Sequence, residues 1–271
     1  MKKLSNSEEK QMIEEYRKGI HVSQLMQKYG YATKKSITDK VKKYYPNNYK
    51  EIIEEAKNNR KDYSIDVENI DDNFTAYFIG LMLIDGYIQD KNKFGIQLID
   101  EDCINFISKI TNKEYKTYND SNINHKEYYR IIFSDKIQVQ NLKRYGIENN
   151  KTKTLAGFDF KIDEEKYIPY VLRGIIDGDG CIYYTTKNTP AFFIITASYE
   201  FAKWLQSLLE NRLYMKDIHI TTTSDNCYRV ETSLFLNMLK LRFIVYDQPY
   251  GMSRKYKLLR KMFRDYNGNF L

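Results

Sequence analysis

The chain has 271 residues, of which 42% are hydrophobic and 29% charged, and its formal net charge is +7. No apolar run reaches the roughly 18 residues that a membrane-spanning helix requires, and the N-terminus leads into polar sequence, so we expect a cytoplasmic globular protein. Three widely spaced cysteines and three scattered histidines argue against a disulfide framework and the usual zinc sites, so any bound metal should have oxygen ligands.

The positive charge is concentrated near the N-terminus. Residues 1–62 carry 15 Lys and Arg against 9 Asp and Glu, whereas residues 63–271 carry 28 against 27. A second basic cluster falls near the C-terminus, on a segment expected to be helical: Arg254, Lys255, Lys257, Arg260, Lys261 and Arg264. Such clusters favour a nucleic-acid partner, although a solvated helix face produces the same pattern.

Residues 1–45 have the pattern of a small helical domain. The run from Ser5 to Glu8 has the spacing of a capping box, in which the serine and the glutamate satisfy free amide groups of a starting helix. Gly19 is placed to end that helix in a left-handed conformation. A second short helix is predicted from Ser23, followed by a tight turn and a third helix with its apolar side chains inward.

That order of helices resembles a helix-turn-helix DNA-binding domain, in which the third helix enters the major groove. Residues 33–42 would then contact DNA through free polar and basic side chains: Thr33, Lys34, Lys35, Ser36, Thr38 and Lys42. A three-helix bundle used for protein contacts is the alternative. Residues 46–73 are polar and charged, with one short helix expected near residues 51–57, and are predicted to be a linker.

The most informative feature of the sequence is a duplicated motif. Residues 78–86 (FIGLMLIDG) return as residues 172–180 (LRGIIDGDG), and the two final glycines are 94 residues apart. Each copy is an apolar run with an internal glycine, and each ends in Asp-Gly. A repeat unit of this length indicates a duplicated domain that places one carboxylate at the same point of each half.

The same succession of elements follows both copies. After the first we expect a hairpin over residues 87–98, a helix over 102–110, strands near 116–118 and 128–133, and a helix over 135–145. After the second we expect strands over 182–186 and 192–196, a helix over 200–213, strands over 218–222 and 228–232, and a helix over 234–241. The repeat therefore extends well beyond the motif.

Both nine-residue runs resemble the motif of LAGLIDADG homing endonucleases, in the single-chain form with two motifs. The resemblance covers roughly residues 74–266. It implies an α+β fold of two pseudo-symmetric αββαββα repeats, here residues 74–158 and 159–271, with saddle-shaped antiparallel sheets over DNA. It also implies a monomeric, Mg²⁺-dependent enzyme that cuts double-stranded DNA at a specific site and spreads its parent intron or other mobile element.

The residue types suit this chemistry. Gly80 and Gly174 allow two helices to approach closely. Each Asp-Gly end puts a carboxylate, Asp85 or Asp179, in the last helical turn beside free carbonyl groups, with the glycine suited to a left-handed cap. An acid is unfavourable at that end of the helix dipole, and bound Mg²⁺ would remove the penalty. Two or three ions shared by the carboxylates could activate water for phosphodiester hydrolysis.

The resemblance further implies a basic residue from each half near the scissile phosphates. Lys151 follows a Gly-Ile pair by the matching distance, and Lys255 stands in an Arg-Lys-Tyr run, so both are candidates for stabilising charge on the phosphate. Ordinary surface lysines are the alternative. Gln97, at the end of the second strand, is a candidate for orienting water, although its counterpart near Ile195 is apolar.

Base recognition is expected from outward-facing strand positions, because a β-ribbon fits the major groove and alternate side chains share a face. Arg130 and Arg229 are the candidates, unless they face away from DNA. The sixth motif position is Asp177 in the second copy but Leu83 in the first. That departure favours two competing functions, a non-cleaving DNA-binding regulator and an intron RNA maturase, whereas the retained Asp85 and Asp179 favour the nuclease.

Overall fold

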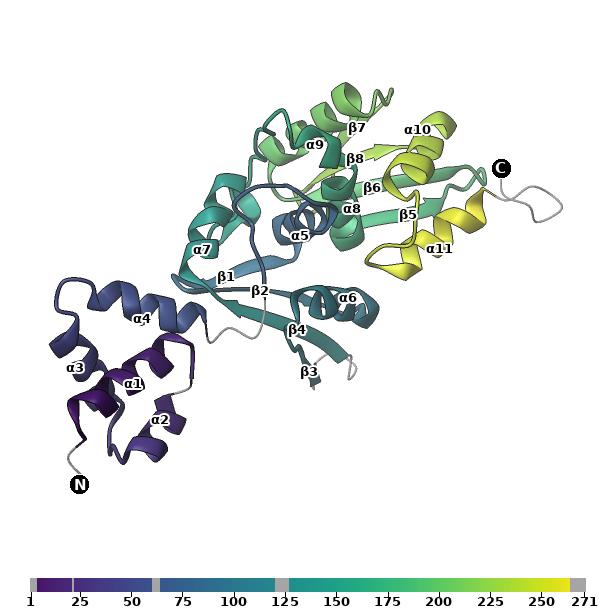
Figure 1. Ribbon diagram of the computed structural model, residues 1–271. Coiled ribbons are helices and arrows are strands. Elements are labelled where there is room, and N and C mark those ends of the chain that lie inside the picture. Colours follow the sequence, from purple (N-terminus) through teal and green to yellow (C-terminus); the bar gives the residue numbers. More distant parts are fainter. Residues whose placement is uncertain (1–3, 21, 60–63, 120–126, 264–271) are drawn as a thin grey trace. The chain divides into compact units, whose positions relative to one another are not determined.

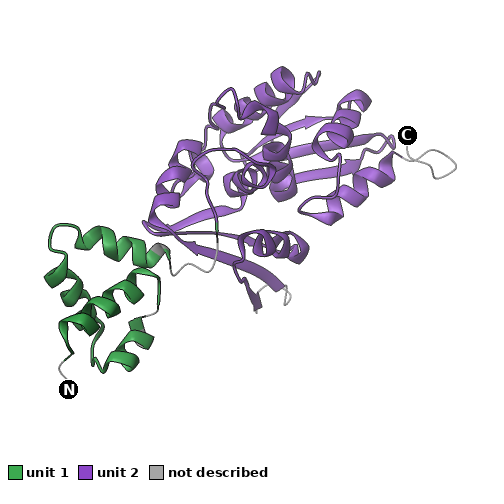
Figure 2. Ribbon diagram, viewed as in Figure 1, with its two compact units in different colours: residues 1–64 green, residues 65–271 purple. Residues whose placement is uncertain are grey.

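The computed structural model describes residues 4–20, 22–59, 64–119 and 127–263. The chain forms two compact units, Met1–Ser64 and Ile65–Leu271, which are coloured separately in Figure 2. Within the described ranges, no helix has both the length and the apolar character that would let it cross a membrane.

The first unit contains four helices in its described part: α1 (Asn6–Arg17), α2 (Val22–Tyr29), α3 (Lys34–Tyr44) and α4 (Tyr49–Asn58). The predicted capping box is present, because the Glu8 amide donates to Ser5 Oγ at 3.2 Å and the Ser5 amide donates to Glu8 Oε2 at 2.7 Å. Gly19 has the predicted left-handed conformation, with φ of 91°.

The core of this unit reaches beyond residue 45. Ile37 and Val41 of α3 are buried as expected, and Ile52 and Ala56 of α4 are buried in the same cluster. These two residues are one helical turn apart and share a face, so α4 packs as a fourth helix. The mostly polar composition of residues 46–73 predicts a linker, because an apolar pair this short does not stand out in the sequence.

The second unit is built around two adjacent helices, α5 (Asn73–Ile84) and α8 (Ile168–Asp179), which lie side by side in Figure 1. Each is followed by an antiparallel sheet of four strands. The first sheet has the order β1-β2-β4-β3, and the second has the order β5-β6-β8-β7. The matching orders confirm the predicted α+β fold of two like repeats.

The strands and helices occur close to the predicted positions. The first sheet comprises β1 (Gly86–Asp90), β2 (Lys93–Leu98), β3 (Lys116–Asn119) and β4 (Glu127–Ser134), with helices α6 (Glu101–Thr111) and α7 (Lys136–Leu142). The second comprises β5 (Gly180–Tyr184), β6 (Pro190–Thr196), β7 (His219–Thr222) and β8 (Tyr228–Thr232), with helices α9 (Tyr199–Arg212), α10 (Phe235–Lys240) and α11 (Ser253–Met262). Of the predicted C-terminal basic cluster, Arg264 lies outside the described residues.

Each sheet has one buried and one outward face. In β4, Tyr129, Ile131 and Phe133 are buried, whereas the alternate residues are half-buried. Phe133 stacks on Phe94 of β2 with ring centroids 5.2 Å apart. The helices pack on the buried face, so the outward face, which carries Gln97 and Arg130 in the first sheet and Arg229 and Glu231 in the second, is available to a partner.

Two glycines control the contact between α5 and α8. A Cβ atom on Gly80 would lie 2.1 Å from the Val171 carbonyl oxygen, and one on Gly174 would lie 2.2 Å from the Tyr77 carbonyl oxygen. Any side chain there would push the two backbones apart. The close approach predicted from the motif is therefore confirmed.

The left-handed caps predicted at Gly86 and Gly180 are wrong. Gly180 is extended, with φ of −75° and ψ of 141°, and Gly86 is absent from the glycines with positive φ. Each glycine instead begins a strand directly after the motif helix. A Cβ atom would lie 2.5 Å from Met82 Cα at Gly86 and 2.5 Å from the Ile176 carbonyl oxygen at Gly180, so the sharp exit from the helix requires glycine.

Candidate catalytic site at the ends of the motif helices

The two motif helices end together, and their ends bring the predicted metal ligands to one place. Asp85 is the C-cap residue of α5, and Asp179 is the last residue of α8. A Cβ atom on Gly178 would lie 2.7 Å from Asp85 Oδ2, so the Asp85 carboxylate lies directly against α8. The two acids, which are 94 residues apart in the sequence, belong to one site.

The carboxylates are electrostatically coupled. Desolvation, and after it the charge of Asp179, raise the pKa of Asp85 to about 7. Asp179 is the more exposed of the two; desolvation raises its pKa as well, against the lowering effect of the Lys255 and Lys151 charges. Two acids held together in a partly dry site repel each other when both are ionised, which is a condition that a bound cation relieves.

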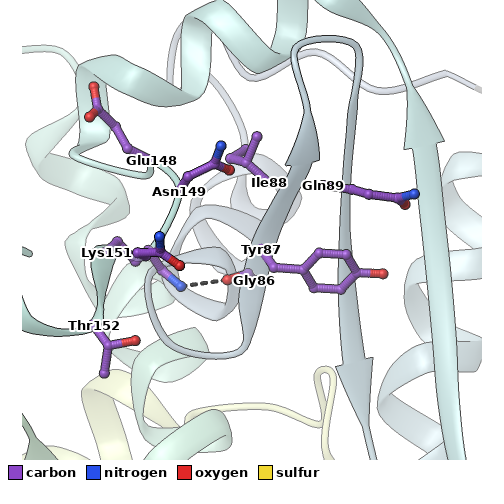
Figure 3. Close-up of a pocket in the computed structure, with 9 residues that line it drawn as sticks. Gly86, Tyr87, Ile88, Gln89, Glu148, Asn149, Lys151 and Thr152 are labelled. Carbon is purple, nitrogen blue, oxygen red and sulfur yellow. Dashed lines mark hydrogen bonds between the residues drawn. The ribbon is translucent and has the colours of Figure 1, made fainter.

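Each motif helix is capped by a lysine from its own repeat. Lys151 Nζ donates to the Ile84 carbonyl oxygen at 3.3 Å and to the Gly86 carbonyl oxygen, as Figure 3 shows for the second contact. Lys255 Nζ donates to the carbonyl oxygens of residues 176–178 at 2.5, 2.7 and 3.3 Å. A cation at this end of a helix is favourable because the last carbonyl groups have no partner within the helix.

Both lysines are buried, with only 7% and 4% of their surfaces exposed. Desolvation lowers the pKa of Lys151 and the pKa of Lys255, while nearby acids oppose that effect: Asp85 and Asp179 for Lys151, and Asp177 foremost for Lys255. The structure therefore brings together four of the predicted site residues, two acids and two bases. It excludes the alternative that these lysines are ordinary surface residues.

A hollow lies beside Lys151. It has a volume of about 440 Å³ and is lined by residues 86–89 and 148–152. In Figure 3, the Lys151 ammonium group points toward Gly86, whereas the ring of Tyr87 and the side chain of Gln89 extend away from it. Gly86, which directly follows Asp85, and the next residues of β1 thus line the hollow.

The donor set fits a hard divalent cation. Mg²⁺ is commonly bound by one or two protein carboxylates together with water and substrate phosphates, and Asp85 and Asp179 supply two carboxylates. No cluster of three or more His, Cys, Asp or Glu side chains occurs in the described ranges. The helix-end carbonyl groups, which the sequence offered as further ligands, are hydrogen-bonded to Lys151 and Lys255 instead.

Asp177, at the sixth motif position, is not part of this site. It is fully buried and accepts hydrogen bonds from Tyr77 Oη at 2.9 Å and Tyr246 Oη at 2.5 Å. Arg173 Nε lies 3.8 Å from Asp177 Oδ2, and burial raises the pKa of this acid to about 6. Sequence analysis missed the pair, although opposite charges four residues apart within an apolar run are a signal for it.

Gln97 is hydrogen-bonded to an arginine of the same sheet. It is exposed on β2, in register with Arg130 of β4, and its Oε1 accepts hydrogen bonds from Arg130 Nε at 3.1 Å and Nη2 at 2.6 Å. The role of Gln97 in orienting water stays a prediction. Arg130 and Arg229 both occupy outward-facing, half-buried positions, as predicted.

The six α3 candidates fall into two groups. The three hydroxyl side chains are used within the helix: Thr33 Oγ1 and Ser36 Oγ lie 2.9 Å apart, and Thr38 Oγ1 donates to the Lys35 carbonyl oxygen at 2.9 Å. Short hydroxyl groups prefer such local contacts, so the expectation that Ser36 and Thr38 remain free is wrong. The three lysines are exposed: Lys34, Lys35 and Lys42.

Comparison with known proteins identifies part of the chain. Residues 167–238 match the family model described as a LAGLIDADG-like domain. No curated protein matches the chain. Similar solved structures include the N-terminal LAGLIDADG domain of DUF199/WhiA, which is 11% identical with a TM-score of 0.46; the alignment covers 68% of this chain and 85% of that one.

Two further similar structures are meganucleases by name. The LAGLIDADG meganuclease I-AabMI bound to uncleaved DNA is 14% identical with a TM-score of 0.45, over 69% of this chain and 87% of that one. A mutant of I-SmaMI is 11% identical with a TM-score of 0.48, over 69% of this chain and 88% of that one. The family match covers α8, its carboxylate and the second sheet, so the resemblance seen in the motif is confirmed: the chain contains a LAGLIDADG-like domain.

Proposed function

We propose that the second unit binds double-stranded DNA and hydrolyses its phosphodiester bonds at the ends of α5 and α8, with a divalent cation as cofactor. One observation carries this proposal: two carboxylates, Asp85 and Asp179, lie at the adjoining ends of α5 and α8, close enough for the charge of Asp179 to raise the pKa of Asp85, and a buried lysine contacts each helix end. Each repeat supplies one acid and one base. A single chain thus offers one set of groups for each DNA strand.

Asp85 and Asp179 would hold the cation, for which Mg²⁺ has the appropriate preference for oxygen ligands. When bound, the cation supplies Lewis-acid polarisation of a phosphate and activation of water. The chain itself holds the two acids in place through the contact of Gly178 with Asp85, and it keeps a positive charge at the end of each helix.

The two lysines are not equivalent in their free donors. An ammonium group has three N–H donors, and Lys255 makes three contacts with carbonyl groups, whereas Lys151 makes two. Lys151 therefore has one donor left for a phosphate oxygen, while Lys255 acts through its charge. Both would stabilise negative charge that develops on the phosphate.

A non-cleaving DNA-binding regulator is the second candidate. Within the described part of the chain, no group of three or more His, Cys, Asp or Glu side chains is placed to hold a metal ion. A protein that binds DNA without cutting it would need the outward faces of the sheets but not this pair. An intron RNA maturase would use the same faces for RNA.

The first unit is proposed as a second DNA-binding element. Lys34, Lys35 and Lys42 are exposed on α3, and none of them has an ion-pair partner among the described residues. Lysines of this kind bind phosphates without reading sequence, so this unit would add affinity rather than specificity. Replacing all three with glutamine should weaken binding to any duplex and reduce its salt dependence.

The decisive experiment is incubation of the full chain with duplex DNA from the region that flanks its own gene, with and without Mg²⁺. We expect a linear product that requires Mg²⁺, and a loss of cleavage of about 10²–10³-fold in Asp85→Asn and in Asp179→Asn. Asp159→Asn, which changes an exposed acid in the segment between the repeats, is the matched control.

The three candidate functions give different results. Retained DNA binding without a cleaved product, in wild type and in both Asn variants, would refute the nuclease and support the regulator. Selective binding of the intron transcript over the duplex would support the maturase. Loss of cleavage in Asp159→Asn to the same degree as in Asp179→Asn would show that the carboxylate pair is not the site.

A further inference from the structure

The two sheets carry an arginine at matched, half-buried positions, and the two side chains differ in their partners. Arg130 of β4 is in register with Gln97 of β2 on one side and with Lys116 of β3 on the other. Gln97 Oε1 accepts from its Nε and Nη2, and the ring of Tyr118 lies 5.0 Å from its guanidinium carbon. The described residues give Arg130 no ion-pair partner, so its charge is oriented but not neutralised.

The matched arginine of the second sheet has a carboxylate partner. Arg229 of β8 has Nε 2.9 Å from Glu231 Oε2, and its guanidinium carbon lies 3.9 Å from the centre of the Phe193 ring. Its Nη2 donates to Tyr183 Oη at 3.0 Å. Its neighbours in register are Ile195 of β6 and a threonine of β7 rather than a glutamine and a lysine.

The residues that cause this difference lie two positions away on the same face of each sheet. In β2, Gly95 lies two residues from Gln97 and is in register with Ile132 of β4. In β6, Phe193 lies two residues from Ile195 and is in register with Glu231 of β8. The ring and the carboxylate that hold Arg229 thus replace a glycine and an isoleucine, and neither of those can hold Arg130.

We propose that the two sheets bind DNA unequally: the first sheet, through Arg130 and its neighbour Lys116, supplies the larger share of the salt-dependent affinity, and Glu231 keeps Arg229 from the phosphates. This inference rests on the proposed DNA binding and adds to it a division between the repeats. Glu231 is then a specificity-determining residue, because the half-site under the second sheet meets a neutral pair and apolar side chains.

The physical reason is counterion release. A free guanidinium group that neutralises a phosphate releases a condensed cation from DNA, which appears as salt dependence of the affinity. Arg229 must first leave Glu231, so its charge is offset by an equal charge that would repel the same phosphate. Arg130 has no such cost, and Gln97 and Tyr118 have already ordered its side chain.

The test uses the full chain and a labelled duplex of fixed sequence, with EDTA present so that cleavage does not intervene. Affinity is measured across a series of salt concentrations for wild type, Arg130→Gln, Arg229→Gln and Glu231→Gln. In Arg130→Gln, the slope of log affinity against log salt should fall by about one. Glu231→Gln frees the Arg229 charge and should bind more tightly, with a slope larger by about one, whereas Arg229→Gln leaves the Glu231 charge unpaired and should bind less tightly.

A double variant, Arg229→Gln with Glu231→Gln, shows whether a change in binding comes from altered charge or from altered folding. It removes the pair without changing the net charge, so it should bind with the wild-type slope. A loss of slope in this double variant equal to the loss in Arg130→Gln, or unchanged binding in Glu231→Gln, would overturn the division between the sheets. If the wild type binds no duplex at low salt, the proposed function itself fails. That result differs from one in which the wild type binds DNA and the variants have equal affinities.

Discussion

The two motif helices reach the same geometry with different interiors. In α8, Arg173 and Asp177 are both completely buried, whereas in α5 the matching positions are Ile79 and Leu83, which are also buried. Both helices still meet through glycine and both still end at a carboxylate. Asp85 and Asp179 thus lie at the helix ends whether the sixth motif position is Leu83 or Asp177, so that position does not decide where the two acids lie.

The ion pair of α8 has its own structural task. Arg173 Nη1 donates to the Gln248 carbonyl oxygen at 2.7 Å and its Nη2 to the Tyr250 carbonyl oxygen at 2.5 Å, while Asp177 accepts from the Met252 amide at 3.3 Å. These contacts hold the segment that leads into α11 and Lys255.

The largest effect is expected when one residue of the Arg173–Asp177 ion pair is replaced. Asp177→Leu should lower the free energy of unfolding of the second unit by about 3–5 kcal/mol, because it leaves Arg173 buried without a countercharge. The double change Arg173→Ile with Asp177→Leu recreates the α5 pattern and should lose less than Asp177→Leu alone. Urea unfolding followed by Trp204 fluorescence measures this, since that residue is the single tryptophan and lies in α9.

A greater loss in the double variant than in Asp177→Leu would contradict this account. It would mean that the carbonyl contacts of Arg173, rather than its charge pairing with Asp177, dominate the stability of the segment. The α5 interior would then not be a workable substitute for the α8 interior.

The second prediction concerns the opposite end of the helix pair. Glu164 precedes α8 and is buried. It accepts hydrogen bonds from the amide of Ile70, which precedes α5, at 3.1 Å and from Arg144 Nη2 at 2.5 Å. Burial alone would raise the pKa of Glu164, but the hydrogen bond from Arg144, with those from the Lys161 and Ile70 amides, leaves this pKa below its usual value. Glu164→Gln should cost about 1.5–3 kcal/mol at neutral pH.

The sign of its pH dependence follows from the lowered pKa. The folded state releases the proton more readily, so this contribution is present above the unfolded pKa and is lost as pH falls through the folded pKa. Urea midpoints measured from neutral to acid pH should therefore fall more steeply in wild type than in Glu164→Gln. Parallel curves would show that Glu164 does not link the two repeats through its charge.

The third prediction compares Gly80 and Gly178, two glycines at which α5 and α8 approach each other. In Gly80→Ala the new methyl group meets the Val171 carbonyl oxygen at 2.1 Å, which is backbone, so α5 and α8 must separate at a cost of about 1–3 kcal/mol. In Gly178→Ala it meets the Asp85 carboxylate at 2.7 Å, which is a side chain that can move. We expect the second variant to lose cleavage more than stability, and equal unfolding free energies would argue against this distinction.

The smallest effect compares the starts of the two helices. Asp72 Oδ1 accepts from the Thr75 amide at 2.7 Å and caps α5, whereas α8 has no side-chain cap and begins with Pro169 in its first turn. Asp72→Ala should cost about 1 kcal/mol by removing the cap. Asp72→Ser, which retains an acceptor, is the matched control and should recover most of that stability in the same urea measurement.

Local sequence patterns determined much of this protein. The duplicated motif, the order of helices and strands after it, the capping box at Ser5 and the inward face of α3 all follow from residues within a few positions of one another. The Asp-Gly ends pointed to Asp85 and Asp179 as a site because the same point recurs in both copies. Such signals depend on near neighbours, which a sequence displays directly.

Only the tertiary structure decided which distant groups meet. Lys151 contacts the Ile84 carbonyl oxygen 67 positions away, and no spacing rule predicts that it caps the helix rather than reaching solvent. The extended Gly86 and Gly180, the fourth helix of the first unit and the pairing of Arg229 with Glu231 likewise depend on how faces pack. Burial and charge pairing are properties of surroundings assembled from several segments, so the sequence named the acids and the fold gave them their partners.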